Sequence, residues 1–419
     1  MKNTISKFYN LFVKDSLYRN AIYLMLNTGV MAFLGFFFWV INTRLYSTEQ
    51  VGIGTTLISV MTLISSFSIL GLDSALIRYL PTSVRKNEKI NTSFILVTLM
   101  SILISMIYLI FLKTFSPKLL FIRENIIFAL LFVLFIVFCS LNTISENVFI
   151  AYRSSKYVLI KNTIFSVAKL ILPFILIALG SYGIFMSVGI SLTIAFGSSI
   201  IFLVMKYNYL LRPKINSDIL KRMTKFSLGN YIAGFLSGSP AMILPILMTN
   251  IIGAKYTAYF YMDMMVANLL YIIPIATSQA LFAEGSYNEL ELKIHLKKSV
   301  KIISMIIVPA ILITVFLGKY ILLVFGKEYS DEGLQFLRLL ALSGIFISFN
   351  TIFGTILRVK HKIMMLIYIN LISAISILGL SYLFLSKGLL GIGLAWITGQ
   401  GLVSLVYFGV ITNKRFIQF

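Results

Sequence analysis

Long apolar stretches alternate with short polar connections along the whole chain of 419 residues. Each stretch has about 20 residues, the length that an α-helix needs to cross roughly 30 Å of hydrocarbon. The runs are continuous, which excludes a strand barrel, whose segments alternate apolar and polar positions. The pattern predicts about twelve membrane-spanning helices, at 21–41, 52–73, 93–112, 126–150, 160–179, 184–205, 230–251, 259–282, 300–318, 335–357, 363–385 and 389–411.

Composition supports a membrane protein. The chain is 59% hydrophobic and 12% charged, whereas soluble domains are about 25% charged. A soluble core cannot enclose so much apolar surface, so lipid must act as the solvent for much of the chain. We therefore predict an all-α polytopic membrane protein.

The basic residues gather in every second connection. Of the 36 lysines and arginines, 8 lie in the intervening connections and 26 lie in the two tails and near 78–89, 153–161, 206–225, 293–301 and 358–362. Cytoplasmic connections carry such an excess of positive charge. We expect both termini to lie in the cytoplasm and the protein to reside in the cell membrane. A nucleic-acid partner is not expected, because a nucleic-acid binder concentrates its basic residues on one patch.

A basic connection divides the predicted helices into two groups of six. It covers 206–226 and separates an expected N-terminal lobe, 1–205, from an expected C-terminal lobe, 227–419. A weak repeat agrees with two lobes, since LYSTEQVGIG at Leu45–Gly54 and IIGAKYTAYF at Ile251–Phe260 each follow the first helix of a half, about 206 residues apart. Transporters are often built from such repeats. Chance similarity between apolar helices stays open as the alternative.

Three motifs follow one another in a fixed order. The first, Leu45–Pro81, is a short acidic turn and a long helix that closes with Gly-Leu and the run ALIRYL. The second is FGKEY at Phe325–Tyr329, followed by LRLLA at Leu337–Ala341, and the third is GLLGIGLAWITGQG at Gly388–Gly401. In this order and spacing they resemble the polysaccharide-biosynthesis membrane proteins, the oligosaccharide flippases of the multidrug/oligosaccharidyl-lipid/polysaccharide exporter superfamily.

The resemblance implies a carrier and not an enzyme. Such a carrier moves an isoprenoid-linked, pyrophosphate-bearing oligosaccharide from the inner to the outer leaflet by alternating access of two lobes. Its implied partners are the lipid bilayer, this lipid-linked oligosaccharide and other membrane proteins of glycan assembly. Three alternatives stay open: a small-molecule or multidrug exporter of the same fold, a membrane glycosyltransferase or polymerase, and a non-transporting scaffold. One departure from the pattern is Ala258, which stands where the first half has Gly52.

A few cations within or beside the predicted helices are candidates for substrate binding. A charge inside the bilayer costs roughly 2.5–3.5 kcal/mol on insertion scales, so it needs a partner or a function. Lys169 lies deepest, and Arg78 and Arg153 lie nearer the cytoplasm. We expect the three to line a cavity for the substrate's pyrophosphate. The alternative is that Lys169 forms a structural pair with Glu146 or Asp73.

Three carboxylates are candidates for coupling transport to protons or sodium ions. They are Asp73, Glu146 and Asp263, and a membrane carboxylate can change its charge with solvent access. A purely structural role is the alternative for each. The sequence has neither a phosphate-binding loop nor a nucleophile elbow, and no metal-ligand cluster is apparent, so we expect no cofactor or metal and no enzymatic activity.

Overall fold

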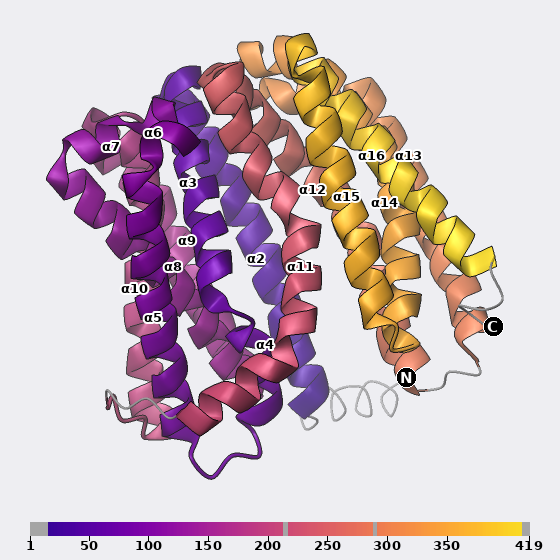
Figure 1. Ribbon diagram of the computed structural model, residues 1–419. Coiled ribbons are helices and arrows are strands. Elements are labelled where there is room, and N and C mark those ends of the chain that lie inside the picture. The colour runs from indigo at the N-terminus through magenta and orange to yellow at the C-terminus, as the bar shows by residue number, and fades with distance from the viewer. Residues whose placement is uncertain (1–15, 213–216, 288–290, 413–419) are drawn as a thin grey trace, which may run out of the picture. The chain divides into compact units, whose positions relative to one another are not determined.

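The computed structural model describes residues 16–212, 217–287 and 291–412 (Figure 1). Within these ranges all regular elements are helical, and twelve of them are long. Each long helix coincides with one predicted span: α2 Ser16–Leu45, α3 Thr48–Ile69, α5 Lys86–Ile110, α8 Ile126–Ala151, α9 Ser155–Ile175, α10 Ser181–Tyr207, α11 Ser217–Ile251, α12 Ala254–Tyr287, α13 Leu292–Leu323, α14 Lys327–Val359, α15 Ile363–Phe384 and α16 Gly388–Thr412.

Short helical pieces join some of the long helices. They are α4 Leu72–Tyr79, α6 Leu112–Phe115, α7 Phe121–Glu124 and the 3-10 turns Pro117–Leu119, Ile177–Leu179 and Leu385–Lys387. In the described part of the chain, eleven continuous stretches are long and apolar enough to cross a membrane, and the last, Ile363–Thr412, contains both α15 and α16. The predicted all-α polytopic membrane fold is confirmed.

The chain divides into two compact units. The first comprises the described residues up to Tyr46 together with Leu57–Tyr231, and the second comprises Ser47–Thr56 and the described residues from Ile232 onward. Of the three boundaries between the units, the first lies between α2 and α3, the second lies inside α3 and the third lies inside α11. The predicted lobes, 1–205 and 227–419, differ from these units in one respect: the first turns of α3 cluster with the second unit.

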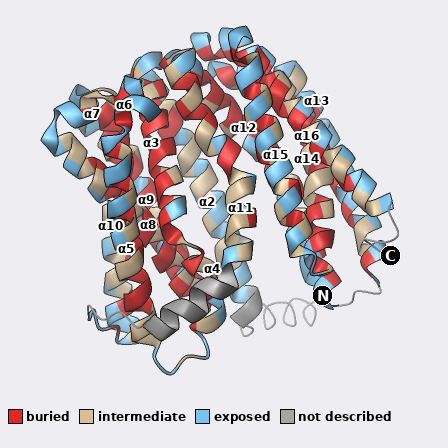
Figure 2. Ribbon diagram, in the orientation of Figure 1, coloured by how far each residue is buried: buried red, intermediate tan, exposed pale blue. Residues whose placement is uncertain are grey.

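In the first unit α9 packs against both α2 and α10, and α8 packs against α5, α10 and α4. Apart from α3, which is mostly buried, these helices bury a minority of their residues, as expected where lipid is the solvent (Figure 2). Small hydroxyl side chains lie at the helix contacts. Ser101 donates a hydrogen bond to Ser140 over 2.9 Å, and Ser140 lies 3.0 Å from the hydroxyl of Ser65, which brings three helices into close approach.

In the second unit α14 packs against α12, α13 and α16, and α16 packs against α15. The start of α3 is fixed there by a close contact. A Cβ placed on Gly52 would lie 1.8 Å from the carbonyl oxygen of Ala254, the first residue of α12. Beside this contact the hydroxyl of Thr249 lies 2.5 Å from that of Thr56 and 2.8 Å from that of Thr257.

A sharp bend follows α3. Leu70 and Gly71 adopt positive φ angles of 53° and 75°, so the helix ends at Ile69 and the chain turns into α4. The predicted span 52–73 is therefore too long at its inner end. Asp73 consequently stands in the first turn of the separate helix α4 and not inside the spanning helix.

Candidate functional site

An open pocket of about 590 Å³ lies on the first unit, and we call it the polar pocket after the polar side chains in its wall. Its walls come from α2, α8, α9 and α10, whose apolar sequences otherwise favour lipid or helix contacts. Most lining side chains are polar or small: Asn27, Thr28, Met31, Ala32, Asn142, Glu146, Asn162, Phe165 and Leu192. Polar groups are costly inside a bilayer, so their convergence on one cavity marks it as the candidate site.

Asn162 organises the polar wall of this pocket. Its side-chain nitrogen donates to Oδ1 of Asn27 over 2.9 Å and to Oε2 of Glu146 over 3.1 Å. One amide therefore joins α9 to α2 and α8. These hydrogen bonds fix the orientation of the carboxylate at the pocket wall, where 31% of the Glu146 side chain remains exposed.

Lys161 supplies a buried positive charge behind the pocket. Its Nζ lies 3.2 Å from Oε2 of Glu146 and 3.0 Å from Oδ1 of Asn142, and the side chain has no exposed surface. Lys161 lies at the boundary between the basic connection 153–161 and the predicted span 160–179, and in the structure it is fully buried within α9, which begins at Ser155. In the sequence, the asparagines within apolar helices are the feature that indicates such a polar network.

Lys169 occupies a different environment, two turns further along α9. Its Nζ lies 4.9 Å from the ring centroid of Phe38 and 4.8 Å from that of Phe165. The residue is 8% exposed, and within the described residues it forms no ion pair with a carboxylate. The proposed structural pair with Glu146 or Asp73 is therefore wrong. Phe165 contacts the ammonium and also lines the polar pocket, so the charge lies close behind the pocket wall.

The other two predicted cations lie at the ends of helices. Arg78 is exposed on α4, with its guanidinium carbon 5.6 Å from the centroid of the Tyr79 ring. Arg153 is exposed in the turn after α8 and has a positive φ of 53°. Neither residue lines the polar pocket. The predicted grouping of both with Lys169 stays a prediction.

Two further carboxylates lie away from the pocket. Burial raises the pKa of Asp73 above its ordinary value, and one of its oxygens is buried without a hydrogen-bond partner in the described structure. Asp263 lies on α12 in the second unit, with no exposed surface. In the described part of the chain neither of its oxygens has a hydrogen-bond partner. A Cβ on Gly333 of α14 would lie 2.7 Å from both oxygens, so this carboxyl group fills the space that the glycine leaves.

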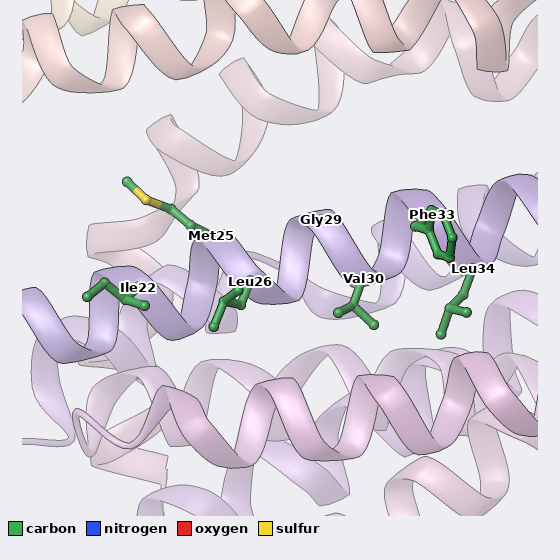
Figure 3. A pocket seen from close by; sticks show the side chains of 7 residues that line it. All are labelled: Ile22, Met25, Leu26, Gly29, Val30, Phe33 and Leu34. Atoms are coloured by element: carbon green, nitrogen blue, oxygen red, sulfur yellow. The ribbon is translucent and has the colours of Figure 1, made fainter.

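A groove of about 560 Å³ also follows one face of α2 (Figure 3). Ile22, Met25, Leu26, Gly29, Val30, Phe33 and Leu34 line it. Because these residues offer neither charge nor side-chain hydrogen bonds, the groove cannot recognise a polar ligand. Within the described ranges, no group of three or more His, Cys, Asp and Glu side chains is arranged to hold a metal ion.

Solved transporters share the fold. A lipid II flippase MurJ in an inward closed conformation is 16% identical, with a TM-score of 0.77 over 94% of this chain and 88% of its own. An inward-facing multidrug resistance MATE family transporter of the MOP superfamily is 15% identical, with a TM-score of 0.72 over 93% and 96%. The outward-facing form of such a transporter is 16% identical, with a TM-score of 0.64 over 95% and 96%. At such identities the likeness establishes the fold alone.

Family sequence profiles give a closer relation. A profile described as MatE matches residues 232–383, and one described as polysaccharide biosynthesis protein matches residues 17–282. No curated protein matches the chain by direct sequence comparison. The match to the polysaccharide biosynthesis profile covers more than half of the chain and includes every residue that lines the polar pocket. The chain is therefore a multi-pass membrane protein that belongs to the polysaccharide biosynthesis protein family and has the fold of the MOP-superfamily transporters.

Proposed function

We propose that this protein moves an isoprenoid-linked, pyrophosphate-bearing oligosaccharide from the inner to the outer leaflet of the cell membrane. The family match over 17–282 is the observation that carries the proposal. The polar pocket among apolar helices supports the proposal, because a sugar that leaves water needs side chains that can form hydrogen bonds with it. The asparagine and threonine side chains around Asn162 provide such groups. The lipid-linked oligosaccharide crosses by alternating access, a mechanism that needs no catalytic residue.

Lys169 is the proposed counter-charge for the pyrophosphate. Its ammonium is nearly buried and lies over two aromatic rings, without a carboxylate partner in the described structure. A cation–π contact stabilises an ammonium by about 2 kcal/mol when it is desolvated, which makes its burial tolerable without neutralising its charge. The charge therefore remains available to an anionic group that reaches the pocket. Lysine binds phosphate in this way, as a point charge.

Arg78 and Arg153 are proposed to attract the substrate before it enters. Both are exposed, and both stand on the side that the charge distribution assigns to the cytoplasm. Surface cations of this kind raise the local concentration of anionic ligands and act chiefly on the rate of association. We expect their loss to have a smaller effect than the loss of Lys169.

Asp263 is the proposed coupling residue among the three candidate carboxylates. Glu146 is already bound to Lys161 and Asn162, and Asp73 lies outside the spanning helices. Asp263 is fully buried, without partners for either oxygen in the described residues. Burial of an unpaired ionised carboxylate is prohibitively costly, so such a group takes up a proton instead. A proton can then bind and leave as solvent access changes during transport.

A deletion strain tests the proposed activity. Without the protein, the lipid-linked oligosaccharide should accumulate on the inner leaflet, and surface glycan should be lost. The wild-type gene should restore both, whereas a gene encoding Lys169→Gln at equal abundance should restore neither. Normal surface glycan in the deletion strain, with no second carrier present, would refute the proposal.

Multidrug export is the second candidate, because the MatE profile matches residues 232–383. An exporter of cationic drugs needs anionic groups in its binding cavity. The polar pocket contains a single carboxylate, Glu146, which is neutralised by Lys161 at 3.2 Å. This arrangement favours the oligosaccharide carrier. Drug sensitivity of the deletion strain, with unchanged surface glycan, would favour the exporter.

A further inference from the structure

A second polar cavity, of about 680 Å³, lies at one end of the first unit. It forms where α5 begins, at Lys86, and where α8 and α10 end, at Ala151 and Tyr207. The charge distribution assigns this end to the cytoplasm. The cavity shares no lining residue with the polar pocket around Asn162, so it is a separate feature.

The walls of this inner cavity are held by hydrogen bonds. Asn91 donates from Nδ2 to the carbonyl oxygen of Leu210 over 2.9 Å, and its Oδ1 accepts from the hydroxyl of Tyr209 over 2.5 Å. These contacts fix the segment after α10 against α5. The rings of Tyr152 and Tyr207 stack at 4.3 Å and 5°, which gives the cavity a flat aromatic wall. The cavity is therefore a built feature and not a gap between loose side chains.

Three cations surround the cavity: Arg85, Lys86 and Arg212. Lys86 lies with its Nζ 5.6 Å from the centroid of the Tyr152 ring. Glu88 lies 3.9 Å from Arg85, and it is the one lining carboxylate. The described lining thus has an excess of positive charge on one concave surface. An anion with several oxygen atoms fits such an arrangement, because each cation offers donors toward the same space.

The rim adds apolar surface to this charge. Val84 is fully exposed and Leu210 is 53% exposed, and both line the cavity. Aliphatic side chains beside cations, at the boundary between helix ends and water, match a ligand whose charged head adjoins a hydrocarbon portion. Basic pockets on the cytoplasmic side of membrane helices bind anionic lipid head groups for the same reason.

We propose that this inner cavity binds a phosphate group, presented by an anionic phospholipid of the inner leaflet. The guanidinium and ammonium groups of Arg85, Lys86 and Arg212 contact the phosphate oxygens, and the head group rests against Tyr152 and Tyr207. The bound lipid anchors the inner end of the first unit to the leaflet. This site does not depend on the proposed transport activity.

The experiment uses the full chain, purified in a neutral detergent. Phosphatidylglycerol and phosphatidylcholine with identical acyl chains are added separately, and the apparent melting temperature and the number of bound lipids by native mass spectrometry are measured. A second arm adds inorganic phosphate or pyrophosphate at constant ionic strength, which distinguishes a soluble phosphate from a lipid head group.

Two sets of variants locate the binding. The triple variant Arg85→Gln, Lys86→Gln and Arg212→Gln removes the cations of the cavity. A matched triple, Lys293→Gln, Lys297→Gln and Lys298→Gln, removes equal charge from α13 in the second unit. A single variant, Val84→Asp, adds a carboxylate at a fully exposed position on the rim, where it displaces no packed side chain.

Phosphatidylglycerol should stabilise the wild type more than phosphatidylcholine does. The cavity triple should weaken this binding by on the order of tenfold or more, Val84→Asp should weaken it less, and the α13 triple should leave it unchanged. An equal response to phosphate or pyrophosphate, lost in the same variants, would support the phosphate site and overturn its lipid source. Equal loss in both triples, or no preference for phosphatidylglycerol in the wild type, would overturn the proposal.

Discussion

The Nζ of Lys161 lies 3.2 Å from Oε2 of Glu146, and this ion pair joins α9 to α8 inside the first unit. Asn162 donates to the same carboxylate oxygen over 3.1 Å and also reaches Asn27 of α2 over 2.9 Å. Three helices that surround the polar pocket are thereby held by one carboxylate and its neighbours. The pair is a structural element of the pocket, and Lys169, which has no carboxylate partner in the described residues, is the cation that we propose for the substrate.

Replacement of Lys161 by Met should destabilise the first unit by about 3 kcal/mol, because the change leaves Glu146 and the oxygen of Asn142 without their buried partner. The apparent melting temperature in detergent should fall. Lys156→Met is the matched control, since Lys156 is exposed on the same helix. Equal melting temperatures for the two variants would contradict the structural role of the pair.

Lys169→Gln should abolish transport without loss of folding. A hydrogen bond to a charged group contributes about 1.5–3 kcal/mol, so substrate binding should weaken by roughly tenfold to a hundredfold. Export in the complemented deletion strain measures transport, and the melting temperature in detergent measures folding. Lys156→Gln should leave both unchanged. Retained export combined with a lower melting temperature would show that Lys169 is structural.

Asp263→Asn should leave the protein folded and remove the dependence of transport on the proton gradient, since an amide cannot exchange a proton at physiological pH. Transport is measured with and without an imposed gradient. Asp331→Asn changes an exposed carboxylate on the neighbouring helix α14 and should retain the dependence. If the Asp263→Asn protein still responds to the gradient, the carboxyl group is not the coupling site.

The stability of the protein should depend on pH through Asp73. Burial raises the pKa of this carboxyl above its ordinary value of 3.8, so the folded state holds the proton more tightly than the unfolded state does. The free energy of unfolding should therefore fall as pH rises from 3.8 through the raised folded pKa. Asp73→Asn removes this penalty.

The Asp73→Asn protein should consequently melt at a higher temperature than the wild type at neutral pH. The difference should shrink as the pH is lowered toward 3.8, because the unfolded carboxyl also takes up its proton as the pH approaches and passes its ordinary pKa. Melting curves between pH 4 and 8 measure this. A difference that does not change with pH would show that charge is not the cause.

Gly52→Ala should disturb the contact between α3 and α12. The added Cβ would lie 1.8 Å from the carbonyl oxygen of Ala254, and because backbone cannot move aside easily, the cost should reach about 1–3 kcal/mol or more. Gly197→Ala is the control, because its Cβ meets no atom within 4 Å. That variant should be neutral or more stable by up to about 1 kcal/mol. Similar melting temperatures for both variants would contradict the close contact.

The helical spans could be predicted because hydrophobic length is a local property of the sequence. Each of the long helices contains a continuous apolar run, and only their ends were misjudged, as at Lys161 and Leu70. In the sequence, a polar or charged residue in the first turns of a helix cannot be distinguished from a residue of the preceding connection. The count of basic residues therefore assigns Lys161 to a connection although the predicted span 160–179 includes it, and in α9 its side chain is fully buried.

The side-chain partners could not be predicted, because they depend on the rotation of neighbouring helices. The sequence offered Lys169 as a partner for Glu146, but Lys161 takes that position and Lys169 turns toward Phe38 and Phe165. Hydropathy also does not reveal that Ser47–Thr56 clusters with the second unit, since the apolar run of α3 continues without a break across Thr56 and Leu57. The packing of Gly52 against Ala254 and the contact between the hydroxyls of Thr56 and Thr249 make that clear.

Reconstitution into liposomes tests the central claim most directly. An isoprenoid-pyrophosphate oligosaccharide is placed in one leaflet, and its arrival in the other is followed with a membrane-impermeant glycosidase. The wild-type protein should transfer the lipid, Lys169→Gln should not, and a cationic dye in parallel vesicles should remain where it was loaded. Dye transport by the wild type without any transfer of the lipid-linked oligosaccharide would contradict the account.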